Sequence, residues 1–109
     1  MYVTDTDATW TDLGGGIRRK IMAHAGGLML VRVAFDAGAQ GARHSHPHEQ
    51  VTYVARGRFA VRIGDAVQTL DTGDSFYAPP HAEHEVLALE AGELVDIFTP
   101  QREDFLGRA

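Results

Sequence analysis

The most constraining feature of this chain is the way glycines divide it into short apolar segments. Twelve of its 109 residues are glycine, against a usual share of about 7%, and they fall between stretches no longer than a β-strand. Glycine at such intervals marks turns, and no window of helical length keeps a 3.6-residue apolar period. The spacing therefore favours many short strands over helices.

The segments between the glycines have the composition and alternation of β-strands. They are rich in β-branched and aromatic residues, and residues 58–63 alternate apolar and other side chains before a turn at Gly64 and Asp65. Strands are predicted at residues 28–35, 51–55, 58–63, 75–78, 84–89 and 94–99. The tail, residues 102–106, is the one helical candidate and is too short to contribute. We expect one all-β domain over residues 1–109, a sandwich or a small barrel.

Charge and composition argue against several classes of protein. The net charge of −5 argues against nucleic acid as a partner, and it requires a locally placed arginine if the substrate is an anion. The absence of cysteine removes disulfides, thiolate nucleophiles and zinc–thiolate sites. The first residues lack the basic start and apolar core of a secretory signal, and no apolar run reaches the length of a membrane span. We therefore expect a cytoplasmic protein with no membrane partner.

Histidines occur in two settings that indicate a metal site. In the first, His44 and His46 are two residues apart, and Gln50 keeps the same parity near the start of the next strand. Side chains at i and i+2 of a strand share a face, so the two histidines are predicted to point at one ion together. In the second, a Pro-Pro turn at residues 79–80 leads into a strand that begins near His84.

These two stretches resemble the two signature motifs of the cupin superfamily. The residues that fit the first motif are Gly38, His44, His46 and Gly57, and those that fit the second are Gly73, Pro79 and His84. Two positions depart from the motifs, because Gln50 stands where an acid is usual and His81 where a glycine is usual. The resemblance covers about half the chain. It implies a cupin fold, a double-stranded β-helix also described as a jelly-roll barrel.

The cupin resemblance also implies one bound divalent metal ion. Its expected ligands are His44, His46, Gln50 and His84, with a water as the alternative to the glutamine. Imidazole ligands suit several ions, so Ni, Zn, Mn and Fe stay open. Three imidazoles and an amide leave the ion its full positive charge, which favours anchoring an anionic or hydroxylated substrate and disfavours high-valent iron. The remaining histidines are interpreted as ordinary hydrogen-bonded residues, with His48 near the mouth of the site: His24, His48 and His81.

A narrower resemblance extends over nearly the whole chain. Residues 10–21, 44–50 and 96–106 resemble the pectin degradation protein KdgF family. That resemblance implies an isomerase-like enzyme that linearises 4,5-unsaturated monouronates, the small sugars left by pectin or alginate lyases. It implicates Asp96 and Arg102 in catalysis, and Phe98 and Arg102 in substrate binding.

The residues themselves give some support to these roles. Asp96 and Phe98 share one face of an apolar strand. A carboxylate there is costly unless it is paired, protonated or turned to a polar cavity. The alternatives are an aspartate that ties down a turn, a phenylalanine of the ordinary core, and an Arg102 that forms a weak surface ion pair.

Two functions of other classes compete with this interpretation. One is a non-catalytic sugar or metabolite sensor, whose usual DNA-binding companion domain does not fit within 109 residues. The other is a three-histidine dioxygenase, which the neutral Gln50 disfavours. Small cupins often pair through their outer strands, so by analogy we expect a homodimer.

Overall fold

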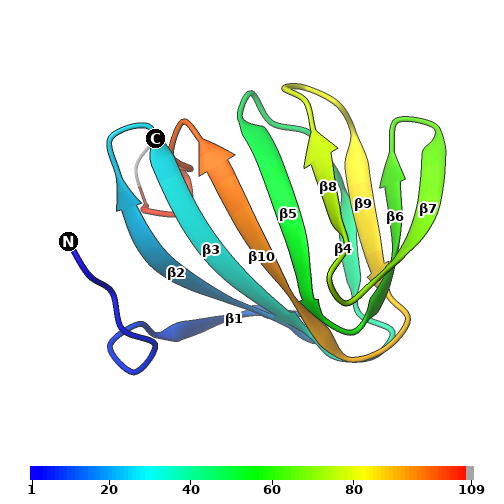
Figure 1. The fold of residues 1–109 in the computed structure, drawn as a ribbon, viewed down its shortest axis with the longest axis horizontal. Coiled ribbons are helices and arrows are strands. Elements are labelled where there is room, and N and C mark those ends of the chain that lie inside the picture. Colours follow the sequence, from blue (N-terminus) through cyan, green and yellow to red (C-terminus); the bar gives the residue numbers. More distant parts are fainter. Residues whose placement is uncertain (108–109) are drawn as a thin grey trace.

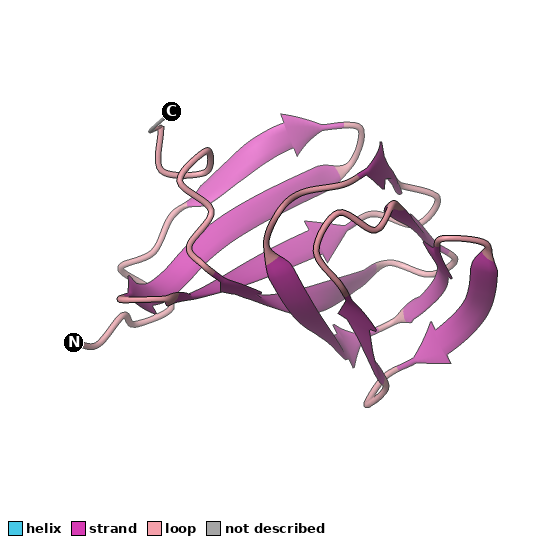
Figure 2. Cartoon of the chain, turned by 90° about the horizontal axis from the view of Figure 1, so that it is seen from above, coloured by secondary structure: helices cyan, strands magenta, loops and turns pink. Residues whose placement is uncertain are grey.

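Ten β-strands form two sheets that face each other in the computed structural model of the protein, which describes residues 1–107 (Figures 1 and 2). The strands are β1 (Trp10–Gly14), β2 (Ile17–Ala25), β3 (Leu28–Phe35), β4 (Gln40–His44), β5 (Glu49–Arg56), β6 (Arg58–Ile63), β7 (Ala66–Asp71), β8 (Ser75–Ala78), β9 (His84–Ala88) and β10 (Gly92–Thr99). Within residues 1–107, no helix has the length and apolar character needed to cross a membrane.

The strand order is that of a double-stranded β-helix. The large sheet runs β1-β2-β3-β10-β5-β8 and the small sheet β4-β9-β6-β7, and the pairings are antiparallel. The last strand, β10, lies between β3 and β5 in the middle of the large sheet (Figure 1). The predicted all-β cupin barrel is therefore confirmed, and its central strand carries residue 96.

All six predicted strands are confirmed, and the four strands that were not predicted have weak patterns. β3, β6 and β8 have the predicted bounds, while β5, β9 and β10 differ from prediction by one or two residues at an end. The strands β1, β4 and β7 were not predicted because most of their residues are exposed and few are apolar. β2 was missed because three consecutive basic residues, 18–20, interrupt its alternation. The tail forms turns instead of a helix.

Two apolar clusters fill the space between the sheets. The larger one includes Phe35, Val54 and Phe59, with the rings of Phe35 and Phe59 edge to face at 5.2 Å. The smaller one, Met29, Val31 and Phe98, is covered by Phe105 and Leu106 of the tail. The polypeptide after β10 therefore returns over the barrel and contributes side chains to its interior.

The start of β10 depends on a glycine that no larger residue could replace. A Cβ on Gly92 would overlap the carbonyl oxygen of Arg56 on β5 and lie 3.0 Å from the Cα of Gly57. This close backbone approach occurs where the register between the two strands shifts at residues 93 and 94.

Replacing Gly92 with alanine is therefore expected to destabilise the fold. Because the added methyl meets backbone, which cannot move aside without breaking strand pairing, we expect Gly92→Ala to lose about 2 kcal/mol or more of unfolding free energy in urea denaturation. Gly27→Ala is the matched control, since its Cβ would meet only Thr99 Oγ1 at an ordinary 3.6 Å. Equal urea midpoints for the two variants would contradict this account.

Candidate metal centre

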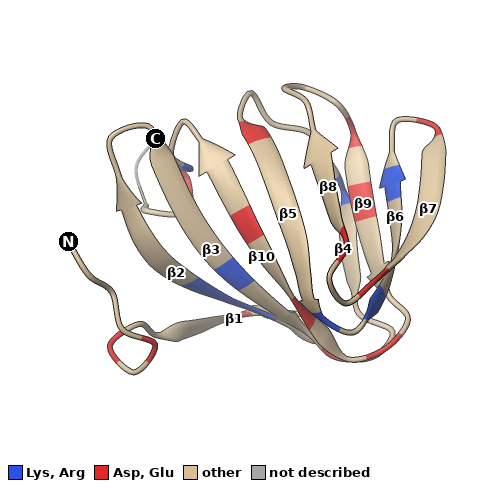
Figure 3. Cartoon of the chain, in the orientation of Figure 1, with Lys and Arg blue, Asp and Glu red and all other residues tan. Residues whose placement is uncertain are grey.

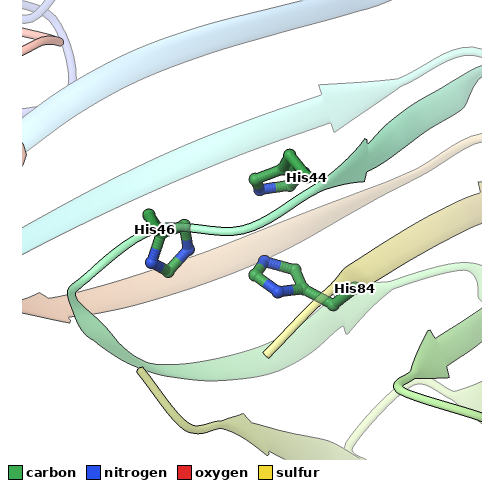
Figure 4. A group of neighbouring side chains, drawn as sticks. All are labelled: His44, His46 and His84. Carbon is green, nitrogen blue, oxygen red and sulfur yellow. The ribbon is translucent and has the colours of Figure 1, made fainter. Parts of the chain in front are cut away.

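Three histidines converge between the two sheets. His44 ends β4 and His84 begins β9, and the two residues are direct register partners in the small sheet. Their ring centroids lie 4.3 Å apart, and that of His46 lies 4.9 Å from His84 and 5.6 Å from His44 (Figure 4). One ring nitrogen from each residue falls within 4.8 Å of the others, so the group could hold a metal ion.

One detail of the sequence prediction was wrong. His44 and His46 were expected on one face of a single strand, but β4 ends at His44 and His46 lies in the following loop. The loop brings the His46 ring to the cluster all the same. Backbone pairing thus places two of the histidines, and a loop conformation places the third.

Each of the three rings is oriented by a backbone carbonyl. The Nδ1 atoms donate to carbonyl oxygens two residues away: His44 to Ala42 at 2.8 Å, His46 to His48 at 3.1 Å and His84 to Ala82 at 3.0 Å. Because a carbonyl can only accept, Nδ1 carries the proton, and in a neutral ring Nε2 is left as a lone pair. This arrangement is the usual one for metal-binding imidazoles.

The Nε2 lone pair of His84 lacks a hydrogen-bond donor. His84 Nε2 is buried and has no hydrogen-bond partner among residues 1–107. Burial lowers the pKa of His84 to about 4, and burial, followed by the nearby Arg102 guanidinium, also lowers the pKa of His46. Both rings are therefore neutral near pH 7. A buried acceptor without a donor is costly, and a cation at this point would satisfy it.

Gln50 adds a further acceptor to the cluster. Asp96 Oδ1 accepts from the Thr52 hydroxyl at 2.6 Å, so the Thr52 oxygen in turn accepts from Gln50 Nε2 at 2.8 Å. This leaves Gln50 Oε1 facing His46 Nε2 at 3.0 Å. Two acceptors face each other there, which repels unless a cation lies near both. The donor set therefore fits a metal ion.

A backbone hydrogen bond links the two loops that carry the cluster. The His81 amide donates to the His46 carbonyl at 2.8 Å, and His81 adopts a φ of 65°, in the left-handed region. That conformation explains why glycine is usual at this position of the motif. The His81 side chain is exposed.

A cavity of about 250 Å³ adjoins the histidines. This is below the ~300–1,000 Å³ typical of drug-sized ligands, so it suits a small metabolite. The side chains of the large sheet and tail that line it include Arg19, Gln50, Asp96, Phe98, Arg102 and Phe105, and those of the small sheet include His44 and His84. The cavity therefore brings together the residues that the sequence singled out, with His46 buried beside them.

Asp96 lines the cavity. It lies opposite Thr52 in the β10–β5 register, on a strand that Figure 3 shows to carry acidic residues. Burial raises the pKa of Asp96 to about 6, although the Thr52 hydrogen bond and Arg102 act in the other direction. Its carboxylate faces the cavity and does not tie down a turn, which was the alternative.

Arg102 is buried, and its main partner is a neighbour in the tail. Its Nε and Nη2 donate to the two carboxylate oxygens of Asp104 at 3.1 and 2.9 Å. The guanidinium carbon lies 5.0 Å from the Phe98 ring centroid and 4.1 Å from that of Phe105. The ion pair expected as an alternative is present, but Arg102 is only 9% exposed and lines the cavity.

Two residues that position or line the site were missed in the sequence. Thr52 is fully buried and connects Gln50 to Asp96. Along β5 it alternates with the same parity as the buried residues Gln50 and Val54, and this parity could have identified Thr52 as an inward-facing residue. Arg19 lines the cavity and was not among the predicted site residues.

The other two histidines differ in whether their side chains are hydrogen-bonded. His24 forms a 2.7 Å hydrogen bond between Nδ1 and Gln101 Oε1, so it is satisfied away from the cluster, as expected. His48 lies beside the site, with its ring centroid 5.4 Å from that of His46, and supplies the carbonyl that orients His46. Its buried Nδ1 has no hydrogen-bond partner among residues 1–107, so the prediction of a hydrogen-bonded side chain is wrong for His48.

Two facing antiparallel sheets that enclose a histidine cluster are the architecture of a cupin. In agreement, the chain matches the Cupin domain family over residues 31–98. The pectin degradation protein KdgF of Dickeya dadantii (strain 3937) is 44% identical over 107 residues, which cover 96% of this chain and 97% of that protein.

Solved structures give the same result. The structure of KdgF from Halomonas sp. has 40% identity and a TM-score of 0.92, with 96% of this chain and 97% of that chain covered. An RmlC-like cupin from Shewanella frigidimarina NCIMB 400 has 39% identity and a TM-score of 0.92, with 95% and 94% covered. This chain therefore belongs to the cupins and, within them, to the pectin degradation protein KdgF family.

The histidine cluster makes a direct prediction about metal content. After dialysis against metal-free buffer, His46→Ala is expected to bind a divalent ion at least about 100-fold more weakly than wild type, since loss of an outer partner alone costs ~10–100-fold. Elemental analysis and metal-dependent thermal stabilisation measure this. His81→Asn is the control, because asparagine tolerates positive φ and the side chain is exposed. Equal retention of metal by both variants would refute the site.

Proposed function

We propose that this protein linearises 4,5-unsaturated monouronates, with a divalent metal ion held by His44, His46, His84 and Gln50. The observation that carries the proposal is the place of Asp96, a carboxylate in the wall of a sugar-sized cavity, linked by hydrogen bonds through Thr52 to Gln50, whose amide oxygen faces His46. A proton-transfer group next to a Lewis-acid site is what ring opening of an enol ether requires. The family relationship supports the same reaction.

The substrate is a cyclic enol ether with a hemiacetal hydroxyl and a carboxylate. In linearisation the anomeric hydroxyl loses a proton, the bond from the anomeric carbon to the ring oxygen breaks, and the former vinylic carbon gains a proton. The product is an isomer, an open-chain keto acid. A bound divalent ion supplies Lewis acidity that stabilises negative charge on oxygen as the ring opens.

Asp96 is the residue proposed to move the proton. Its Oδ1 is held by Thr52 at 2.6 Å and by a longer contact of 3.4 Å from Gln50 Nε2, which fixes the carboxyl group in one orientation. The group takes the proton from the anomeric hydroxyl or delivers it to the carbon that becomes saturated. One carboxyl group can serve both steps, because the reaction consumes and releases one proton.

Arg102 and Phe98 are proposed to bind the sugar. Phe98 is 2% exposed and presents its ring to the cavity beside His46, with the centroids 5.7 Å apart. Arg102 is held in place by Asp104 through one edge of its guanidinium, which leaves Nη1 to contact the substrate. Its positive charge also opposes the overall charge of −5 and draws an anion into the cavity.

The competing functions make different use of the same residues. A dioxygenase would have to stabilise high-valent iron with three imidazoles and an amide, none of which carries a charge. A sensor would bind the sugar but would have no need of a proton-transfer group at Asp96. The homodimer, the cytoplasmic location and the absence of nucleic-acid and membrane partners stay predictions.

Turnover of a freshly generated unsaturated uronate tests the reaction. A proton NMR time course of unsaturated galacturonate is expected to lose its vinylic proton faster with metal-loaded wild-type protein than without it. His46→Ala should return the rate to the spontaneous one. An unchanged rate with the loaded wild type would reject the proposal, and oxygen uptake by an iron-loaded sample would then favour the dioxygenase.

Asp96→Asn separates proton transfer from metal binding. Asparagine retains an acceptor for Thr52 but has no proton to exchange, so we expect a loss of about 10²–10⁴-fold in kcat with normal metal content. Asp65→Asn, in an exposed turn, is the matched control and should retain full activity. Wild-type kcat in Asp96→Asn would remove the residue from the proton-transfer role.

A further inference from the structure

Arg19 is a charged residue in an inward-facing position of a β-strand. It lies in β2, and its neighbours of the same parity, Ile17 and Ile21, pack against the two apolar clusters. The Arg19 side chain lines the cavity. The flanking basic residues of opposite parity are paired elsewhere, Arg18 with Asp36 at 3.4 Å and Lys20 with Asp5 at 2.9 Å. Figure 3 shows this basic segment on β2 in the large sheet.

No carboxylate neutralises Arg19 among residues 1–107. The buried Nε has no hydrogen-bond partner, and the ion pairs of the described chain do not include this residue. Its guanidinium instead packs over the Phe105 ring, with the carbon 4.0 Å from the centroid. Burial lowers the pKa of Arg19, which Asp104 partly opposes and Arg102 reinforces. The group stays cationic, because arginine remains protonated in proteins.

The two acidic residues that line the cavity already have hydrogen-bond or ion-pair partners. Asp96 accepts from Thr52, and Glu85 pairs with Arg62 at 3.0 Å and Arg43 at 3.5 Å. Neither one is a partner for Arg19. The cavity therefore holds a cation that forms no direct ion pair among residues 1–107 and interacts with Asp104 only at longer range.

Arg102, the second arginine that lines the cavity, already has one edge of its guanidinium occupied. Arg102 already uses its Nε and Nη2 for the two oxygens of Asp104. Both guanidinium groups contact the single ring of Phe105, at 4.0 and 4.1 Å from its centroid. The two neighbouring cations are partly removed from water, and only the exposed carboxylate of Asp104 offsets their charge. This arrangement is energetically unfavourable until another anion binds.

We propose that Arg19 binds the carboxylate of the uronate substrate through paired hydrogen bonds, with Arg102 as a single additional donor. This inference rests on the proposed function, since it assigns the substrate's carboxylate to a residue. A guanidinium edge with two parallel donors matches a planar carboxylate, and such charge-assisted pairs are about twice as strong as neutral ones.

The location of Arg19 gives this contact a role in specificity. Arg19 belongs to β2 of the large sheet, whereas His44 and His84 belong to the small sheet. A sugar held by its carboxylate at Arg19 and by its oxygens near the histidines spans the cavity in one orientation, with Asp96 between the two anchors. A neutral sugar lacks the first anchor, so Arg19 distinguishes uronates from neutral hexoses.

Steady-state kinetics of Arg19→Gln test the contact during turnover. We expect KM for the unsaturated uronate to rise about 10–100-fold with a much smaller change in kcat, because the contact is made in both ground and transition states. Arg19→Lys keeps the positive charge but lacks the two parallel donors, so its KM should lie between those of wild type and Arg19→Gln. Arg18→Gln, on the exposed side of the same strand, is the matched control and should match wild type. Wild-type KM in Arg19→Gln would overturn the proposal.

Binding without turnover separates this proposal from the reaction. In NMR titrations, metal-loaded wild type is expected to bind saturated D-galacturonate at least 10-fold more tightly than D-galactose. Arg19→Gln should lose most of that ratio while its galactose affinity and metal content stay unchanged. A wild type that discriminates but shows no turnover would leave the Arg19 site standing and reject the reaction. Equal ratios in wild type and Arg19→Gln would overturn the Arg19 site whatever the activity.

Discussion

Hydrogen-bond acceptors without donors, gathered between two sheets, are the constraint on which the rest of the site depends. The carbonyls of Ala42, His48 and Ala82 fix three imidazoles so that their lone pairs converge. The amide of Gln50 is turned the same way because Thr52 takes its N–H. Thr52 in turn donates its hydroxyl to Asp96. A single threonine thus links the amide whose oxygen faces the histidines to a carboxylate in the cavity.

The position of the last strand explains how the rest of the cavity is assembled. β10 enters the middle of the large sheet between β3 and β5, which places Asp96 and Phe98 opposite Thr52 and Gln50. The chain that leaves β10 then folds back over the barrel, so Arg102 and Phe105 reach the same interior. A protein with a net charge of −5 in this way places two arginines in the wall of its cavity. These arginines come from β2 and the tail, whereas His44 and His84 belong to the small sheet.

The sequence predicted the parts of the site that follow from spacing and parity. Motif spacing predicted the cupin fold and the three histidines that converge, and strand parity predicted that Asp96 and Phe98 share one face. Strand parity was wrong for His46, because the end of β4 depends on pairing with β9 and not on the local pattern. Arg19 was hidden in a run of three basic residues, where only the sheet register separates the inward one from its neighbours. The place of Phe105 could not be predicted, since the turns of the tail have no periodicity.

The left-handed conformation at His81 bears on how proteins of this type are recognised. The position is usually glycine, yet the structural requirement is a backbone angle and an amide that reaches the His46 carbonyl. Histidine meets both, as asparagine or aspartate could, at a modest conformational cost. A sequence pattern that demands glycine there would pass over this chain although its three clustered histidines are present. A search pattern written for the φ angle, and tolerant of the few side chains that accept it, would recover such divergent members.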